Sequence, residues 1–234
     1  MIHFLIVQLG SDDLMVTALA SIDRFAGHCN VDVVKLPLDT RDPRAHGQAI
    51  DDWRRFQQVS VMDRDVVCIM DPDVVLLSAQ WRVAADEAFD NPHVGIWGAG
   101  AQEDFGPRVH ASLLCVRGSI FNTLERSFTP CLDLREQTWR DTGGLYCMWV
   151  KHAGHEVRPL ERGPDWHGAA AWWGRVAVPR QRLPVWQPVP LWAHLGGGSH
   201  SDPTRMTPWQ RLRNWRLLQK RQRFLAAARA YLRA

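Results

Sequence analysis

The sequence predicts an α/β protein in which a mixed sheet is covered by helices on both faces. Short apolar runs alternate along the chain with segments whose apolar residues recur at helical spacing. These runs are continuous rather than alternating with polar residues, which is typical of strands buried on both faces. The 234 residues are enough for one large domain with its own core.

Each expected element has a local signal. Continuous apolar runs predict strands at 3–7, 31–36, 66–70, 74–77, 94–97 and 113–116. Helical spacing predicts helices at 12–25, 43–56, 78–89 and 209–232, the last of them basic and amphipathic. Ser11, Pro43 and Ser78 suit the starts of the first three helices. The stretch 162–208 is rich in Gly, Pro and Trp and is expected to be mostly loop.

Composition excludes several classes of protein. The chain is 46% hydrophobic and 23% charged, with a mean hydropathy of −0.26. No apolar run approaches the roughly 18 residues of a membrane span, and residues 1–7 lack the pattern of a signal peptide. The five cysteines form no CxxC pair, so a disulfide framework is not expected. These features exclude a disordered, fibrous, transmembrane or disulfide-stapled protein. We expect the protein to be in the cytoplasm, a reducing environment.

Charge and tryptophan are distributed unevenly. All 25 acidic residues lie at or before Asp202, whereas the last 32 residues carry nine bases and no acid. Nine of the 12 tryptophans fall between Trp139 and Trp215. The back half of the chain is therefore expected to contact something aromatic, sugary or anionic.

Asp71-Pro72-Asp73 is the strongest chemical signal. The two carboxylates follow a buried strand, and ligands of α/β sheets bind in the crevice at the carboxyl ends of the strands. Carboxylate oxygens suit a hard divalent cation that also holds a diphosphate. Asp-Pro-Asp is also good turn chemistry, so by itself the tripeptide leaves a simple turn open.

The order of five segments along the chain resembles the GT-A glycosyltransferases, and the resemblance extends from His3 to about Ser201. Asp71 and Asp73 match the DxD motif of that family. The other matching segments are 3–21, 46–50 followed by Trp53, 141–145 with Gly154-His155, and 192–199. The resemblance implies a nucleotide-sugar-binding domain at residues 1–202, with 203–234 as a basic helical extension packed on it.

The resemblance implies a donor site built around a metal ion. Asp71 and Asp73 would hold Mn²⁺ or Mg²⁺, and His194 would supply the third ligand. The donor, expected to be a UDP-sugar, would contact Asp71 and the glycines Gly10, Gly196 and Gly197. Glycines beside His194 would let backbone amides approach the diphosphate. The alternative for this segment is a glycine-rich surface loop with an incidental histidine.

Asp141 is the candidate base. A carboxylate at a helix start can accept the proton of an acceptor hydroxyl as that hydroxyl attacks the anomeric carbon, which inverts this carbon. The alternative is that Asp141 only caps the helix running through Leu145, Trp149 and His152. The family's usual acidic pair is here Arg140-Asp141.

Five further residues are candidates for the sugar and acceptor pocket. His110 matches a family segment that lines this pocket, and its neighbours Glu103 and Asp104 could contact sugar hydroxyls, although an ordinary solvated loop is the alternative. Trp172 and Trp173 could stack on a sugar or on an unstacked base. The ring of Trp192, in the same tryptophan-rich stretch, could stack in the same way.

The basic helix is the candidate anionic-binding surface, through Arg211, Arg213, Arg216, Lys220, Arg221 and Arg223. Its favoured partner is DNA, with a hydroxymethylated pyrimidine as acceptor, and a flipped base would then stack on the tryptophans. A glycan, a lipid-linked or small-molecule acceptor, and peripheral contact with an anionic membrane remain alternatives. So do a non-catalytic sugar- or nucleic-acid-binding module and a nucleotidyltransferase.

Overall fold

A computed structural model describes residues 1–8, 12–37, 42, 44–57, 60–100, 109–130, 132–133, 138–139, 142–160, 185–186, 189–195 and 208–233. Within this part, only the backbone is described for 99–100, 110–111, 132–133, 138–139, 185–186, 189–190 and 208–217.

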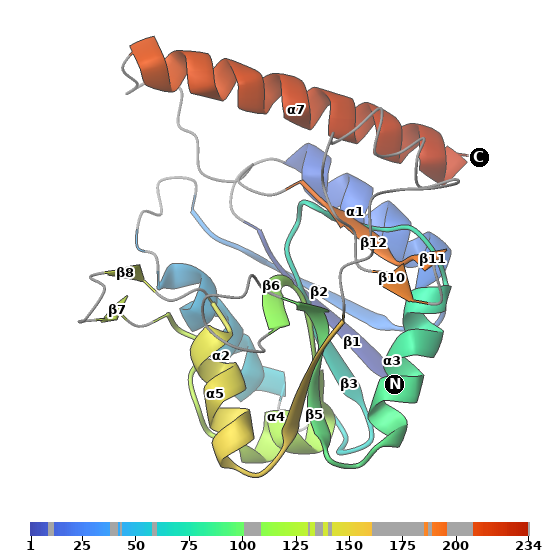
Figure 1. Ribbon diagram of the computed structural model, residues 1–234, viewed down its shortest axis with the longest axis vertical. Coiled ribbons are helices and arrows are strands. Elements are labelled where there is room, and N and C mark those ends of the chain that lie inside the picture. Colours follow the sequence, from blue (N-terminus) through green and yellow to red (C-terminus); the bar gives the residue numbers. More distant parts are fainter. Residues whose placement is uncertain are drawn as a thin grey trace.

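The strands and helices alternate along the chain as the sequence predicts (Figure 1). The strands are β1 (Ile2–Gln8), β2 (Asn30–Lys35), β3 (Val66–Met70), β4 (Val74–Leu76), β5 (Val94–Gly100), β6 (Val109–Arg117), β7 (Leu132–Asp133), β8 (Thr138–Trp139), β9 (Glu156–Leu160), β10 (Val185–Trp186), β11 (Val189–Pro190) and β12 (Trp192–His194). The helices are α1 (Asp12–Phe25), α2 (Ala45–Gln57), α3 (Gln80–Asp90), α4 (Gly118–Thr123), α5 (Gly144–His152) and α7 (Pro208–Arg233).

A six-stranded mixed sheet forms the centre, in the order β2-β1-β3-β6-β5-β9. Strands β2, β1 and β3 are parallel to one another, so their carboxyl ends share one edge of the sheet. Strand β6 runs antiparallel to both β3 and β5, and β5 is parallel to β9. The predicted mixed sheet is therefore confirmed.

Helices cover both faces of this sheet, because successive side chains of a strand point to opposite faces. Phe4 and Ile6 of β1 pack in one buried cluster with residues of α1 and α3. Leu5 and Val7 pack in the other cluster with residues of α2, α4 and α5. Figure 1 shows α1 and α3 on one side of the sheet and α2, α4 and α5 on the other. The predicted coverage of both faces is confirmed as well.

A two-stranded ladder lies beside the carboxyl edge of the main sheet. Strand β12 pairs antiparallel with β4, with Trp192 opposite Leu76 and His194 opposite Val74. Within residues 162–208, which the sequence predicts to be mostly loop, residues 192–194 form a strand that hydrogen-bonds to β4, a strand far away in the sequence. This pairing carries the late histidine to the edge at which β3 ends.

The basic C-terminal helix α7 is present and packs along α1 and the β4–β12 ladder (Figure 1). Phe224, Leu225, Ala227 and Ala228 are buried in a third cluster, which also contains Leu14, Val75, Leu77, Ala193 and Leu195. The Tyr231 hydroxyl donates a hydrogen bond to the Leu77 carbonyl. Among the residues that the structure describes, no helix combines the length and apolar character needed to cross a membrane.

Candidate metal and donor site

Asp71 and Asp73 occupy a tight turn between β3 and β4. The Asp71 amide donates to the Ser112 carbonyl of β6 at 3.0 Å, and the Val74 amide donates to the Asp71 carbonyl at 3.1 Å. These bonds fix the backbone at the point where the polar residues follow four buried residues of β3. Asp-Pro-Asp is therefore a turn, as one interpretation of the sequence holds, and this turn places two carboxylates at the carboxyl edge of the sheet.

Strand β12 brings His194 to these carboxylates. The Leu195 amide donates to the Asp73 carbonyl at 3.0 Å, which extends the β4–β12 pairing past its last residue. His194 Nε2 lies 3.2 Å from Asp73 Oδ1 and 3.8 Å from Asp71 Oδ2. One ligand atom from each of the three residues lies within 4.8 Å of the others. We call Asp71, Asp73 and His194 the triad.

The electrostatics of the triad favour a cation between its members. Burial lowers the pKa of His194, but the hydrogen bond to Asp73 and the charges of Asp73 and Asp71 raise it, and the net direction is upward. Two carboxylates held this close repel each other unless positive charge lies between them. Carboxylate oxygens with one imidazole nitrogen form a donor set that suits Mn²⁺ and Mg²⁺, with the nitrogen favouring Mn²⁺. The residues present therefore fit a divalent cation.

His46 is a fourth member of the neighbourhood that the sequence reasoning did not assign to the site. It lies in the first turn of α2, and its Nε2 is 3.5 Å from Asp71 Oδ1. A helix that follows a parallel strand begins at the edge where that strand ends, so residues at the start of α2 and the end of β3 share an edge. That topological rule is the signal that could have identified His46.

Lys220 of α7 also reaches this neighbourhood. Its ammonium group donates a hydrogen bond to the carbonyl of Leu195, the residue that follows His194. Lys220 belongs to the expected anionic-binding set, of which Arg223 is exposed and Arg221 half-buried. The helix therefore contributes a cation to the edge that carries the triad.

The remaining candidates are described only in part. Only the backbone is described for His110, in β6, and for Arg211, Arg213 and Arg216, in α7. The candidates outside the described residues are Gly10, Glu103, Asp104, Asp141, Trp172, Trp173, Gly196 and Gly197.

Trp192 corrects one expectation about the tryptophans. Its side chain is fully buried, and its ring meets that of Trp97 edge to face with centroids 5.8 Å apart. Trp192 is a core residue and is not available to stack on a sugar.

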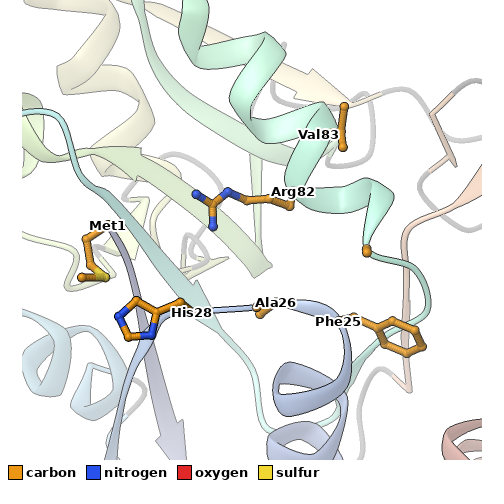
Figure 2. A pocket seen from close by; sticks show the side chains of 8 residues that line it. Met1, Phe25, Ala26, His28, Arg82 and Val83 are labelled. Atoms are coloured by element: carbon orange, nitrogen blue, oxygen red, sulfur yellow. The ribbon is translucent and has the colours of Figure 1, made fainter.

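A cavity of about 540 Å³ lies at the opposite edge of the main sheet, next to Met1 at the start of β1. Figure 2 shows the Arg82 side chain extending into it between Met1, His28 and Val83. Its lining includes none of the triad residues. The cavity is therefore separate from the candidate metal centre.

Comparisons with known proteins give a distant structural likeness only. No protein-family model matches the sequence, and a search of curated proteins finds no relative. The chain is similar to the mannosyltransferase PcManGT from Pyrobaculum calidifontis, solved with GDP-Man and Mn²⁺, at 14% identity and a TM-score of 0.47. That alignment covers 75% of this chain and 60% of the mannosyltransferase, so the chain spans less than two thirds of that protein.

Two other glycosyltransferases show a likeness of the same order. A Drosophila β1,4-galactosyltransferase 7, solved with manganese, UDP-Gal and xylobiose, has 14% identity and a TM-score of 0.49, over 90% of this chain and 78% of its own. GlyE from Streptococcus pneumoniae has 14% identity and a TM-score of 0.43, over 92% of this chain and 59% of its own. These proteins belong to the enzyme class that the sequence resemblance implies. Similarity at this level assigns neither reaction nor substrate to this chain.

Proposed function

We propose that the chain is a metal-dependent glycosyltransferase that moves a sugar from a nucleotide sugar, expected to be a UDP-sugar, to an acceptor hydroxyl. The observation that carries this proposal is the convergence of Asp71, Asp73 and His194 at the carboxyl edge of a mixed α/β sheet. The pairing of β12 with β4 brings His194 to both carboxylates.

Each residue of the triad has a role in donor binding. Asp71, Asp73 and His194 would hold Mn²⁺ or Mg²⁺. The bound ion supplies positive charge that offsets the charge developing on the departing diphosphate. The ribose and diphosphate would lie against Asp71 and the glycine segment after Leu195.

Asp141 is the proposed base, with inversion at the anomeric carbon as the outcome. Its support comes from the neighbouring described residues. Gly143 lies against Leu114 of β6, and Leu114 pairs with Ile69 near the carboxyl end of β3. Gly143 therefore lies near the edge that carries the triad, and Asp141 precedes it by only two residues in the sequence. It would take the proton from the acceptor hydroxyl as the new glycosidic bond forms.

A hydroxymethylated pyrimidine in DNA is the proposed acceptor. Its support is the charge of α7, which carries eight bases and no acid over 26 residues. Backbone phosphates bind such a helix through release of their counterions. Glycan, lipid-linked and small-molecule acceptors are the other outcomes that an acceptor screen distinguishes.

The test offers UDP-, GDP- and dTDP-sugars to the intact protein, with and without Mn²⁺, and measures release of the nucleoside diphosphate. Asp73→Asn keeps the shape of the side chain and removes its charge, and Asp90→Asn, at an exposed position on α3, is the matched control. We expect metal-dependent release that Asp73→Asn abolishes and Asp90→Asn leaves intact. Binding of no sugar nucleotide by the parent protein would overturn the proposal.

A second experiment tests the acceptor and the stereochemistry. The donor found above is incubated with hydroxymethylated and unmodified duplex DNA, and the DNA is digested and analysed by mass spectrometry. We expect sugar on the hydroxymethylated DNA alone. An α-linked product from an α-linked donor would remove the inverting role of Asp141, and transfer only to a glycan would replace DNA as acceptor.

A further inference from the structure

Two cysteine side chains face each other in the centre of the main sheet. Cys68 of β3 lies directly opposite Cys115 of β6 in the antiparallel ladder, and their Sγ atoms are 3.2 Å apart. Both side chains are fully buried, in the cluster that also contains Met70 and Leu113. The register of the sheet therefore brings together two thiols that lie 47 positions apart in the sequence.

The ladder places the two cysteines at a non-hydrogen-bonded pair of residues. The Asp71 amide donates to the carbonyl of Ser112, the residue opposite it, so this pair is hydrogen-bonded. Hydrogen-bonded and non-hydrogen-bonded pairs alternate along an antiparallel ladder, and Cys68 precedes Asp71 by three residues, an odd number. The Cα atoms of a non-hydrogen-bonded pair lie about 4.5 Å apart, which falls within the range of roughly 4.4 to 6.8 Å that a disulfide spans.

Burial keeps this pair of thiols unreactive while the ladder is closed. Burial raises the pKa of the Cys68 thiol, and the neighbouring Cys115 raises it further. A neutral thiol is a poor nucleophile, so the pair reacts only when the ladder opens or before it has formed. Cys29 packs against the same cluster and is half-buried, so it is the competing partner for either thiol.

From the register and the sulfur contact we propose that Cys68 and Cys115 are a site of reversible covalent modification, which a small-molecule disulfide oxidises to a cross-strand disulfide. The thiolate of one cysteine attacks a sulfur of the small disulfide, forms a mixed disulfide and releases one small thiol. The thiolate of the other cysteine then attacks the protein sulfur of the mixed disulfide and releases the second small thiol. The two cysteines lose two electrons and two protons, and the two released thiols carry both. An excess of small thiol reverses the reaction.

The disulfide would tie β3 to β6 next to the turn that carries the candidate metal ligands. Hydrogen bonds already close the ladder at both ends, from the Asp71 amide to Ser112 and from the Gly118 amide to Asp65. A covalent link between residues 47 positions apart also restricts the unfolded chain, so the oxidised protein should unfold at a higher temperature than the reduced protein. Neither metal nor nucleotide sugar takes part, so this inference is independent of the proposed function.

The test refolds the full chain from urea in mixtures of oxidised and reduced glutathione, since the unfolded chain exposes every thiol. The remaining thiols are then alkylated, and linked peptides are mapped by mass spectrometry. The parent protein is compared with Cys115→Ala, which removes one partner, and with Cys29→Ser, the matched control. In the parent and in Cys29→Ser we expect the Cys68–Cys115 link to exceed any other pair about tenfold or more, because the folded sheet gives this pair a high effective concentration.

Thermal denaturation of the oxidised and reduced forms gives a second measurement. Comparing the two forms of each variant removes the destabilisation that Cys115→Ala itself causes. We expect oxidation to raise the Tm of the parent and of Cys29→Ser by about 5–10 °C and to leave that of Cys115→Ala unchanged. A link from Cys68 to Cys29 in place of Cys115 would overturn the inference. So would survival of both thiols at the most oxidising ratio, which would make the sulfur contact a thiol hydrogen bond only.

Discussion

Backbone hydrogen bonds between β4 and β12 hold His194 next to Asp73, independently of any contact between their side chains. Val74 follows Asp73 and faces His194 across the β4–β12 ladder, and the amide after His194 donates to the Asp73 carbonyl. The 3.2 Å between His194 Nε2 and Asp73 Oδ1 is therefore set by strand register. A site built on strands keeps its geometry when no ligand is present, which reduces the ordering cost of binding.

Asp73→Asn should remove most of the metal affinity. The substitution replaces a charged oxygen ligand by a neutral amide, so we expect Mn²⁺ binding to weaken about 100-fold, the upper end of what loss of a supporting residue costs. Titration of the protein with Mn²⁺ alone measures the effect without any sugar nucleotide. Asp90→Asn should bind Mn²⁺ as the parent does, and retention of parental affinity by Asp73→Asn would exclude Asp73 as a ligand.

His46→Gln should have a smaller effect of the same kind. His46 lies 3.5 Å from Asp71 and orients or screens that carboxylate, so we expect Mn²⁺ affinity to fall about tenfold. His28→Gln is the control, because His28 lines the cavity at the opposite edge of the sheet. A loss as large as that of Asp73→Asn would instead make His46 a direct ligand.

Asp65 predicts how stability depends on pH. Burial would raise the pKa of Asp65, but hydrogen bonds from the Met1 amino group, the Met62 amide and His3 lower it to about 2. A depressed pKa stabilises the folded state above the unfolded value of 3.8, and this contribution disappears as the pH falls towards 2. The shift corresponds to about 2 kcal/mol at pH 7.

Asp65→Asn should therefore lose about 2 kcal/mol of unfolding free energy at pH 7 and much less at pH 2. Urea denaturation at the two pH values measures the difference. Asp63→Asn, at an exposed position two residues earlier in the chain, is the matched control and should stay close to parental stability at both pH values. The same loss at both pH values would attribute the effect to packing rather than to the charge of Asp65.

Gly47→Ala should destabilise the fold strongly. A Cβ at this position would lie 2.4 Å from the Thr129 Cα and 2.6 Å from the Phe128 carbonyl oxygen. Both neighbours are backbone, and the segment is held to α2 by Asp51, which accepts hydrogen bonds from the Phe128 amide and the Thr129 hydroxyl. Relief would require the helix and the segment to separate, so we expect a loss of about 2 kcal/mol or more.

Thermal denaturation of Gly47→Ala measures this loss. Gln48→Ala, at an exposed position in the same turn of α2, is the matched control and should be close to neutral. Parental stability of Gly47→Ala would show that the contact between α2 and residues 128–129 is looser than the structure has it.

Local patterns predicted strand β3 and helices α1 and α3 closely. Strand β3 begins and ends where its apolar run does, because both of its faces are covered. The helices α1 and α3 begin and end within two residues of their expected bounds, which is the usual uncertainty of a helix terminus. The sequence also identified Asp71 and Asp73 as site residues, because their carboxylates interrupt an otherwise apolar stretch.

Tertiary contacts decided the features that the sequence patterns missed. Strand β12 has only three residues and lies in a stretch rich in Gly, Pro and Trp. Its strand conformation comes from its pairing with β4 and not from a run of apolar residues. Trp192 is buried because that pairing turns it toward Trp97. His46 meets Asp71 through the packing of α2 on the sheet, which no local pattern encodes. Asp141, Glu103 and Asp104 stay predictions, since they lie outside the described residues.

The order of the chain has a consequence for synthesis. The ribosome synthesises Asp71, Asp73 and the sheet strands that support them long before it synthesises His194, the third member of the triad. Until β12 has emerged and paired with β4, the nascent protein carries an acidic turn with two of its three ligand groups. The triad is thus complete only after β12 has been synthesised, so a product that terminates before His194 would lack the third proposed ligand.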